Sequence, residues 1–476
     1  MPAPSRFVGV NVMPEYFQVE GIEAVLDQVQ GRAGATAITT CPYVMQPADA
    51  RTGAREPPID GGAGSVRHLD RPLWGGKQEL FVATAPAFVP DRSLYSGLRY
   101  QPPTPDVLTA QTGATIAEAI RSAKARGLEV HLQIQAACPP GYRVSFGGPV
   151  EDDLPRLPDF SLPHGRVDNN ASLASPHVRT YLRAAITDLC RAYPDIDGIR
   201  LDWPEYPPYR LEDLFFDFSA PARDAAERLG FDFEAMRRDA LSTWNALRGG
   251  AFSGAALAAL HAPSGGAATL TGLLLRAPGL LQLLRFRAAL AIELIADARA
   301  ALKSCGTHRQ LSPNAFPPPW SLLSGFDFGA AASCCNSISV KFYTMHWPMI
   351  LRFYADRLLE WCPSLDPSLL AQTLVQVTDI GAHDIRGLDA LRYPADEEPH
   401  PVSAEAQQRK LRLARQQAAA GGPAPVRALV HGYGPTDDFR ARLAAVFDTS
   451  GRQVWVNRYG YLSDAKLNAL GEVTAA

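Results

Sequence analysis

Short apolar segments alternate along this chain with longer segments of helical periodicity. Eight segments rich in Val, Ile and Leu are predicted strands, at residues 7–13, 35–43, 128–135, 196–202, 309–315, 337–343, 426–431 and 453–457. Apolar residues recur at helical spacing in the predicted helices 21–30, 116–125, 176–193, 349–378 and 403–419. Strands that alternate with helices are typical of α/β proteins with a parallel sheet.

Eight strands with intervening helices favour a (β/α)8 TIM barrel. An open, doubly wound sheet is the alternative with the same alternation. Its dinucleotide-binding members carry Gly-x-Gly-x-x-Gly after the first strand, and neither that motif nor a P-loop follows any predicted strand here. We therefore predict the barrel and expect no cofactor.

Four long segments interrupt the predicted alternation. We expect a single catalytic barrel domain over residues 1–476, with insertions at 44–110, 138–170, 209–304 and 382–425. The first two are rich in Pro and Gly and are expected to be loops after the second and third strands. The third is mainly helical and follows the fourth strand, whereas the last is polar and partly helical.

Composition narrows the possible partners. Hydrophobic residues make up 46% of the 476 residues and charged residues 20%, as in ordinary globular proteins. The net charge of −3 gives no electrostatic case for nucleic acid or for an anionic membrane surface. The seven cysteines show no Cys-x-x-Cys spacing, so neither a disulfide framework nor a zinc site is indicated. No signal peptide or transmembrane segment is visible, and a cytoplasmic location is expected.

Strand alternation places polar side chains inside the predicted barrel. Alternate residues of barrel strands point into the lumen, and active sites lie at the C-terminal strand ends. The more polar register contains Asn11, Thr39, Cys41, His131, Gln133, Gln135, Arg200, Asp202, Ser312, Asn314, Lys341, Tyr343, His431 and Asn457. So many hydrogen-bonding groups suit a ligand dense in hydroxyls, which favours a carbohydrate over a phosphate or a hydride donor.

The stretch 196–208, IDGIRLDWPEYPP, carries the strongest candidate chemistry. Asp202 ends the fourth predicted strand, and the charge of Arg200 on the same face would keep its carboxylate ionised. Glu205 follows among aromatic residues and prolines, where a raised pKa is expected. We predict Glu205 as general acid/base and Asp202 as nucleophile or electrostatic stabiliser.

Other acids could supply the second carboxylate. Glu15 follows the first predicted strand, and Asp437 and Asp438 follow the seventh. Residues at the strand ends and in the loops after them are the candidates for substrate binding. They are Glu15, Tyr43, Gln135, Arg200, Trp203, Tyr206, Asn314, Lys341, Tyr343, His346, Trp347, His431, Tyr433 and Asn457.

The fourth-strand stretch resembles the signature of glycoside hydrolase family 18, Asp-Gly-x-Asp-x-Asp-Trp-Glu-Tyr-Pro. The residues that match are Asp197, Asp202, Trp203, Glu205, Tyr206 and Pro207, with Pro204 inserted and Arg200 in place of the middle aspartate. The resemblance implies that Glu205 is the general acid.

Two further resemblances cover the same region. Gly198, Arg200 and Asp202 are similar to the Gly-x-Arg-x-Asp of α-amylase-like enzymes, which implies a nucleophilic Asp202. Residues 168–210 also resemble hypothetical glycosidase-like barrels. Together these likenesses imply a TIM-barrel glycoside hydrolase that acts on an oligo- or polysaccharide.

Two other functions stay open. A non-catalytic carbohydrate-binding barrel is consistent with the lack of a carboxylate in residues 312–320, after the fifth predicted strand. A metal-dependent TIM-barrel hydrolase would need His131, Asp202, His346 and His431 to converge. No His-x-His or His-x-x-x-His spacing supports that arrangement, and no metal is expected.

Overall fold

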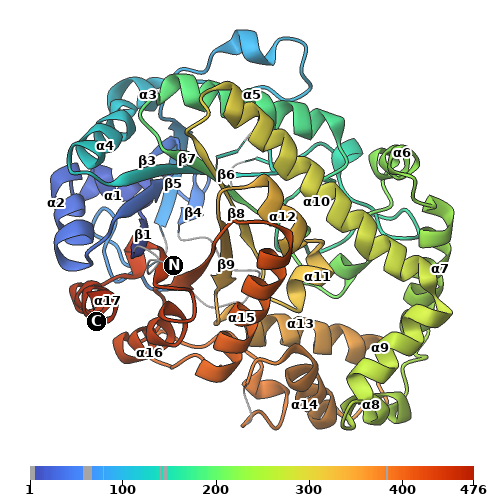
Figure 1. Cartoon of the computed structure of the whole chain (residues 1–476). Helices are drawn as coiled ribbons and strands as arrows, with labels where there is room; N and C mark the ends of the chain where they lie inside the picture. The colour runs from blue at the N-terminus through green and yellow to red at the C-terminus, as the bar shows by residue number, and fades with distance from the viewer. Residues whose placement is uncertain are drawn as a thin grey trace.

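The computed structural model describes residues 6–56, 67–78, 80–139, 141–142, 147–381 and 384–475. Eight parallel strands close into a barrel in the order β1-β11-β10-β9-β8-β7-β6-β2 (Figure 1). They are β1 (Phe7–Asn11), β2 (Ala37–Thr40), β6 (Glu129–Gln135), β7 (Gly198–Asp202), β8 (Gln310–Ala315), β9 (Ile338–Phe342), β10 (Val426–His431) and β11 (Gln453–Asn457). The predicted (β/α)8 barrel and its eight strands are confirmed.

One predicted strand is shorter than expected. Residues 35–43 were expected to form a single strand, but β2 ends at Thr40 and the chain leaves the barrel. Pro42 has no backbone N–H to continue a strand ladder. The next residue begins β3 (Tyr43–Pro47), which forms an antiparallel sheet with β5 (Leu80–Pro86) and β4 (Ala54–Glu56). The expected loop at 44–110 therefore carries a small sheet of its own.

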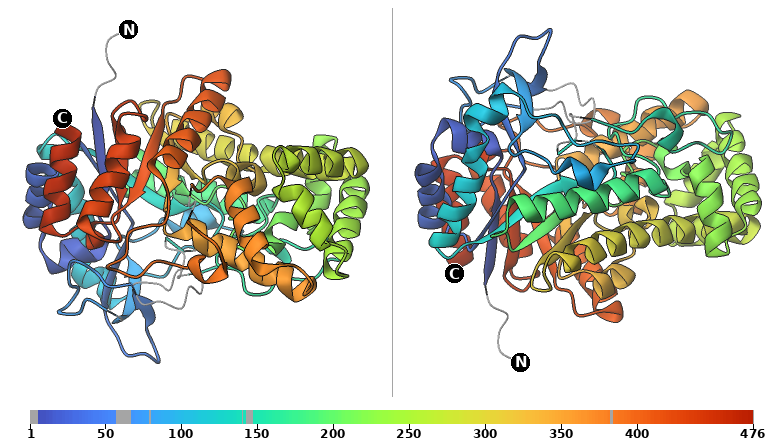
Figure 2. Two further views of the ribbon diagram at one scale, coloured as in Figure 1. Left: turned by 90° about the horizontal axis from the view of Figure 1, so that it is seen from below. Right: turned by 90° about the horizontal axis from the view of Figure 1, so that it is seen from above.

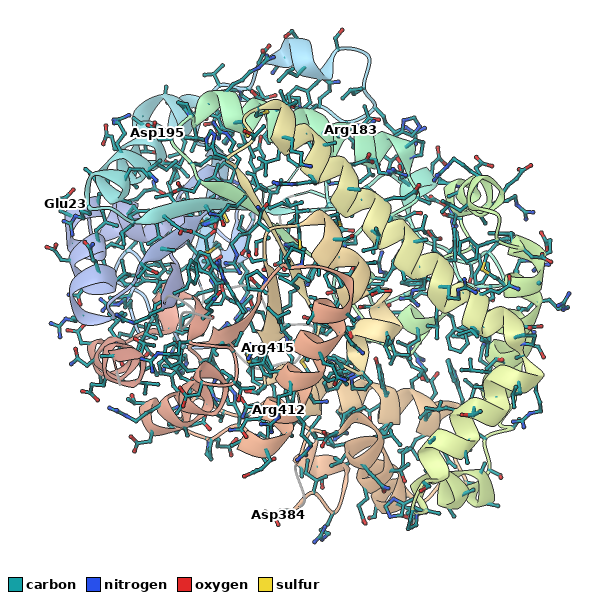
Figure 3. All side chains as sticks on the ribbon, in the orientation of Figure 1. Glu23, Arg183, Asp195, Asp384, Arg412 and Arg415 are labelled. Carbon is teal, nitrogen blue, oxygen red and sulfur yellow. The ribbon has the colours of Figure 1, made fainter. Side chains whose placement is uncertain are left out.

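Helices surround the barrel (Figure 1). They are α1 (Pro14–Val19), α2 (Ile22–Leu26), α3 (Val107–Thr112), α4 (Ala114–Ala125), α5 (Pro176–Ala192), α10 (Pro278–Ser304), α11 (Trp320–Ser324), α12 (Phe328–Cys334), α13 (His346–Trp361), α14 (Pro367–Thr378), α15 (Ala404–Gly421), α16 (Thr436–Phe447) and α17 (Asp464–Ala475). Exposed charges such as Glu23, Asp195 and Asp384 lie at the periphery (Figure 3).

The predicted helical stretch 349–378 is two helices, α13 and α14. Asp366 ends the connection between them, because its side chain accepts a hydrogen bond from Leu369 N, 2.7 Å away, and Pro367 follows at the first helical position. A side-chain cap followed by proline is a strong helix start.

The helical insertion after β7 adds α6 (Ala220–Leu229), α7 (Phe233–Arg248), α8 (Gly254–His261) and α9 (Gly265–Arg276). These four helices project to one side of the barrel, away from both chain ends (Figure 2).

Among the described residues, no helix is both long enough and apolar enough to cross a bilayer.

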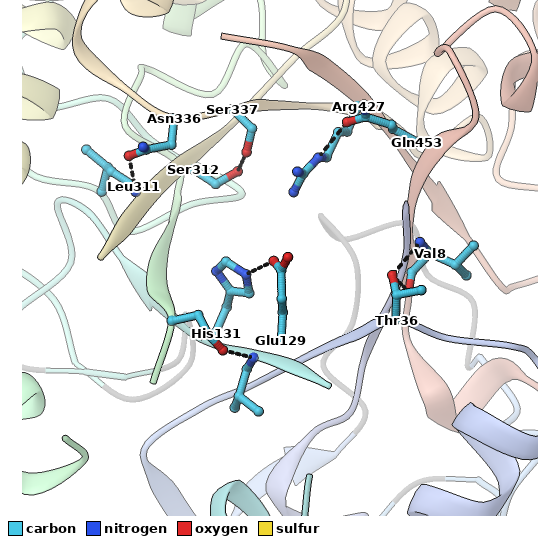
Figure 4. A network of polar contacts seen from close by, with 12 residues as sticks. Val8, Thr36, Glu129, His131, Leu311, Ser312, Asn336, Ser337, Arg427 and Gln453 are labelled. Atoms are coloured by element: carbon cyan, nitrogen blue, oxygen red, sulfur yellow. Dashed lines mark hydrogen bonds and ion pairs between the residues drawn. The ribbon is translucent and has the colours of Figure 1, made fainter. Parts of the chain in front are cut away.

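The lower lumen is packed with side chains. Trp455 lies at its centre, with the Arg200 guanidinium 4.1 Å from one face of the indole and the His131 ring at 5.5 Å, edge on. Toward the N-terminal strand ends, the Glu129 carboxylate contacts His131, and Arg427 donates a hydrogen bond to Gln453 at 3.1 Å (Figure 4). A filled lumen directs any ligand to the C-terminal strand ends.

Candidate active site at the end of strand β7

Asp202, the last residue of β7, is partly open to solvent, with 16% of its side chain exposed. Its Oδ1 lies 2.9 Å from Lys341 Nζ and accepts a hydrogen bond from Asn314 Nδ2 at 3.2 Å. Burial acts to raise the pKa of the carboxyl group. The Lys341 charge, the Asn314 hydrogen bond and the more distant Arg200 outweigh that effect, and the pKa of Asp202 lies below its usual value. The carboxylate is therefore held ionised.

Lys341, rather than Arg200, makes the direct ion pair. Arg200 lies deeper in the lumen and donates to Asn314 Oδ1 at 2.9 Å and to Ser339 Oγ at 3.3 Å. Burial lowers the pKa of Arg200 to about 10, so the guanidinium still carries its charge at neutral pH. Because Arg200 holds Asn314, and Asn314 donates to Asp202, the arginine orients the carboxylate through an intermediate side chain.

The loop after Asp202 turns sharply at Trp203. This residue has φ = 49°, a left-handed conformation that costs a non-glycine residue roughly 1 kcal/mol or more. The buried Asn170 side chain holds the turn, because its Nδ2 donates to Trp203 O at 2.9 Å and to Glu205 O at 3.1 Å. In the sequence, Trp203 stands between the two candidate acids. Its indole ring is partly exposed and contacts the Tyr209 ring edge on.

Glu205 is fully buried beside the end of β8. Its Oε1 accepts a hydrogen bond from Phe316 N at 3.0 Å, and its Oε2 pairs with Ser324 Oγ. Burial raises the pKa of Glu205 to about 7, although the Lys341 charge and both hydrogen bonds act against the increase.

The Ser324 hydroxyl is consistent with a protonated Glu205. Ser324 Oγ also lies 2.9 Å from Ser321 O, which can only accept a hydrogen bond. A hydroxyl has one proton to donate. If that proton goes to Ser321 O, the proton between Ser324 and Glu205 must come from the carboxyl group. The strand exit thus combines an ionised acid and an acid that is readily protonated.

Aromatic rings and histidines cluster beside this acid pair. The Tyr343 ring contacts His346 at 5.6 Å and His431 at 5.1 Å, and Tyr209 Oη lies 3.2 Å from His346 Nδ1. His431 in turn contacts the Tyr461 ring at 5.2 Å. The structure therefore brings together Tyr343, His346 and His431, which sequence reasoning selected separately.

The alternative acids occupy other surroundings. Glu15 is buried, lies 3.6 Å from the guanidinium of Arg458 and accepts a hydrogen bond from Tyr43 Oη at 3.4 Å. Asp438 pairs with Arg442 at 2.6 Å, and Asp437 is exposed in the first turn of α16.

Several candidate substrate contacts lie in the protein interior. Tyr206 is fully buried and its hydroxyl donates to Asp217 at 2.9 Å. Trp347 packs on the Trp320 ring at 5.6 Å, and the Tyr433 hydroxyl donates to Pro394 O. Asn457 accepts a hydrogen bond from Asn11 at 2.6 Å. Gln135, which pairs with Asp202 across the β6–β7 ladder, is partly exposed beside the acid.

Sequence reasoning missed residues that support the site from distant segments. Asn170, Ser324 and Arg458 are at most slightly exposed and contact the candidate residues Trp203, Glu205 and Glu15. Arg458 also lies 2.9 Å from Glu56. Tyr209 was also missed, although it follows the strand-four stretch directly. The only feature of the sequence that could have indicated Tyr209 is its position next to the stretch 196–208.

The histidines considered as metal ligands are separated. His131 lies in the lower lumen against Trp455, whereas His346 and His431 contact Tyr343 at the strand ends. Within the part of the chain that the structure describes, no three His, Cys, Asp or Glu side chains gather as a metal site.

No protein-family model and no curated protein matches this sequence. Solved structures with a similar course of the chain include glycoside hydrolases. The β-galactosidase of Marinomonas ef1 is 11% identical, with a TM-score of 0.47, over 95% of this chain and 54% of its own. The β-amylase catalytic domain of Paenibacillus polymyxa is 10% identical, with a TM-score of 0.48, over 97% of this chain and 94% of its own.

A class V chitinase from Pseudomonas fluorescens is 11% identical, with a TM-score of 0.41, over 98% of this chain and all of its own. The present chain spans about half the length of the β-galactosidase. Similarity at this level says nothing about the reaction, so any function has to be argued from the side chains of this protein.

Proposed function

We propose that this protein is a glycoside hydrolase that cleaves an oligo- or polysaccharide at the C-terminal end of strand β7. The observation that carries the proposal is the contrast between Asp202 and Glu205. Three residues apart on one strand exit, the first has a lowered pKa and the second a pKa raised to about 7. Glycoside hydrolysis requires one ionised and one protonated carboxyl group.

Each acid has a role in this mechanism. Asp202, partly exposed, is the nucleophile or stabilises the positive charge that develops on the sugar. Glu205 donates the proton to the leaving oxygen. Glu205 is fully buried, with its carboxyl oxygens on Phe316 N and Ser324 Oγ, so a sugar reaches it only after a local rearrangement of these contacts.

Solvent exposure at the strand ends supports a sugar ligand there. Gln133, Gln135, Asp202, Trp203 and Tyr343 are each partly exposed, while Asn314 and Lys341 behind them are buried. Amides and a carboxylate can bond to sugar hydroxyls, and the Trp203 and Tyr343 rings offer faces for the apolar side of a pyranose.

The test is release of reducing ends from a panel of polysaccharides and aryl glycosides. We expect activity in the unaltered chain and its loss in Asp202→Asn and Glu205→Gln. Glu129→Gln is the matched control, because Glu129 is a lumen carboxylate far below the strand ends. Loss of activity in Glu15→Gln would indicate that Glu15, rather than Asp202, is the second catalytic carboxylate. A chain that cleaves none of the panel contradicts the proposal.

A carbohydrate-binding barrel without catalysis is the second candidate. It is favoured by one observation: both Glu205 oxygens are engaged, with Phe316 N and Ser324 Oγ, and neither is exposed. Oligosaccharide binding measured by calorimetry, with no reducing ends released, would support the binding protein over the enzyme.

A further inference from the structure

The helical insertion is unusual in its charge. From residue 240 to residue 292 the sequence contains no Asp or Glu, while Arg248, Arg276, Arg285 and Arg287 lie within it. The net charge of −3 for the whole chain gave no reason to expect contact with an anionic surface. That average conceals a segment that carries only positive charge.

Exposed leucines lie in the same segment, on helix α9 and at the start of α10. Helix α9 has no buried residue, and Leu270 and Leu275 on it are 55% and 78% exposed. Leu281, in the first turn of α10, is 46% exposed. Isolated exposed leucines are ordinary, but several that project from one corner of a molecule mark an interaction surface.

Arginines flank these leucines. Arg276 follows Leu275 at the end of α9, and Arg285 follows Leu281 by one helical turn, which places both on one face of α10. Both arginines are exposed. We refer to Leu270, Leu275, Arg276, Leu281 and Arg285 as the α9–α10 corner.

Asp239, the last acid before this segment of the sequence, has partners of its own within the fold. Asp239 accepts a hydrogen bond from Gly279 N at 2.7 Å, close to the start of α10, and its second oxygen lies 3.4 Å from Arg238. Its side chain is only 14% exposed. The carboxylate is thus used within the fold, and both corner arginines are exposed to solvent.

We propose that the α9–α10 corner docks on a lipid surface with anionic headgroups. Leucines that enter the interface and arginines that meet phosphate or carboxylate headgroups are the two components of peripheral membrane binding. Helix α9 and the start of α10, which follows it directly, lie on the side of the molecule opposite the C-terminus (Figure 2).

Charge complementarity favours lipid over a second copy of the chain. A twofold symmetric dimer brings the same patch of both subunits together. Arg276 and Arg285 would then face their own copies without an acid from residues 240–292 to pair with. An anionic, fluid surface pairs with both arginines and accepts leucines in any arrangement.

The test is co-sedimentation of the full chain with phosphatidylcholine vesicles with and without roughly 30% phosphatidylserine. We expect at least about fivefold more bound protein on the anionic vesicles, and release in about 0.5 M NaCl. Leu275→Ser/Leu281→Ser and Arg276→Gln/Arg285→Gln should each abolish the difference. Leu413→Ser/Arg412→Gln, on the exposed face of α15, is the matched control and should bind like the unaltered chain.

Three outcomes overturn the proposal. They are equal sedimentation with and without phosphatidylserine, equal loss of binding in the α15 control, and a dimer by light scattering that the corner substitutions dissociate. Circular dichroism of each variant checks the fold, which substitutions of exposed side chains should leave intact.

Discussion

Lys341 Nζ lies 2.9 Å from Asp202 Oδ1 inside the barrel, and only 2% of the lysine side chain is exposed. The Phe316 ring is 4.8 Å from the same ammonium group. A charge pair with so little solvent around it is screened only weakly. The lysine therefore determines the protonation state of Asp202.

Lys341→Met should shift the acid limb of the pH–activity profile to higher pH. Lys341 lowers the pKa of Asp202, so its removal raises that pKa and the carboxylate becomes protonated earlier on acidification. We expect kcat/KM in mild acid to fall by about tenfold or more. The profile of Lys341→Arg, which keeps the charge, should move less. An unchanged acid limb in Lys341→Met would show that Asp202 does not govern activity.

Glu205→Gln should keep the fold and lose activity. An amide can accept the hydrogen bond from Phe316 N and donate to Ser324 Oγ, as a protonated Glu205 does. We expect a stability within about 1 kcal/mol of the unaltered chain and an activity at least ~100-fold lower. Glu205→Ala removes both bonds and leaves a cavity, which should cost about 2–4 kcal/mol in urea unfolding. If Glu205→Gln is as unstable as Glu205→Ala, Glu205 is not protonated in the folded chain.

Glu205 should lower the stability of the fold as pH rises from 5 to 7, against the opposite contribution of the buried His131 and His400, whose pKa values burial lowers. Glu205 has a pKa of about 7 when folded and about 4.3 when unfolded, so between these values only the folded chain binds the proton. Its contribution is complete below the unfolded pKa and is lost as pH rises through the folded pKa, a total change of ~4 kcal/mol. Asp213, whose pKa burial and the nearby Asp168 raise to about 8, acts in the same direction.

Urea unfolding at pH 5, 6, 7 and 8 measures this slope. Glu205→Gln should remove part of it and leave the part due to Asp213. A slope that is identical in the two proteins would contradict the raised pKa of Glu205.

Asn170→Ala should lower activity more than its cost in stability explains. The substitution releases the carbonyls of Trp203 and Glu205, which Asn170 Nδ2 holds in place. We expect about 1–3 kcal/mol of destabilisation and a decrease in kcat that exceeds the increase in KM. Asn169→Ala is the matched control, because Asn169 is exposed and donates to Gly147 O instead. A loss of activity equal to that of Asn169→Ala would mean that the Trp203 turn needs no support.

The barrel could be predicted because its strands are local. Each barrel strand has four to seven residues, and apolar or β-branched residues with a turn on either side indicate it in the sequence, as for Gly198–Asp202. Alternation then assigned His131, Arg200, Asp202 and Lys341 to the lumen, and their cross-barrel contacts agree.

The partners of the site could not be predicted, because they come from loops far away in sequence. Asn170 bonds to residues 33 and 35 positions later, and Ser324 meets Glu205 across 119 residues. The spacing of apolar and polar residues along the chain does not indicate which distant loops meet at the site. For the same reason the sequence offered only Arg200, which shares the strand, as the charge that keeps Asp202 ionised. Arg200 does lower that pKa, but the ion pair is made by Lys341, two strands away in the sheet.

Gly9→Ala should destabilise the barrel through Trp455. The two residues pair across the β1–β11 ladder, and a Cβ built on Gly9 would lie 2.1 Å from the indole Cε3. The indole cannot withdraw easily, because Arg200 and His131 pack against it. Overpacking of this kind costs about 1–3 kcal/mol, and a rigid ring places the expected loss at the upper end. In a double-mutant cycle measured by urea unfolding, Gly9→Ala should be much less costly in a Trp455→Leu background, with a coupling of about 1 kcal/mol or more. Additive losses would mean that Gly9 is required for a reason other than the space that Trp455 fills.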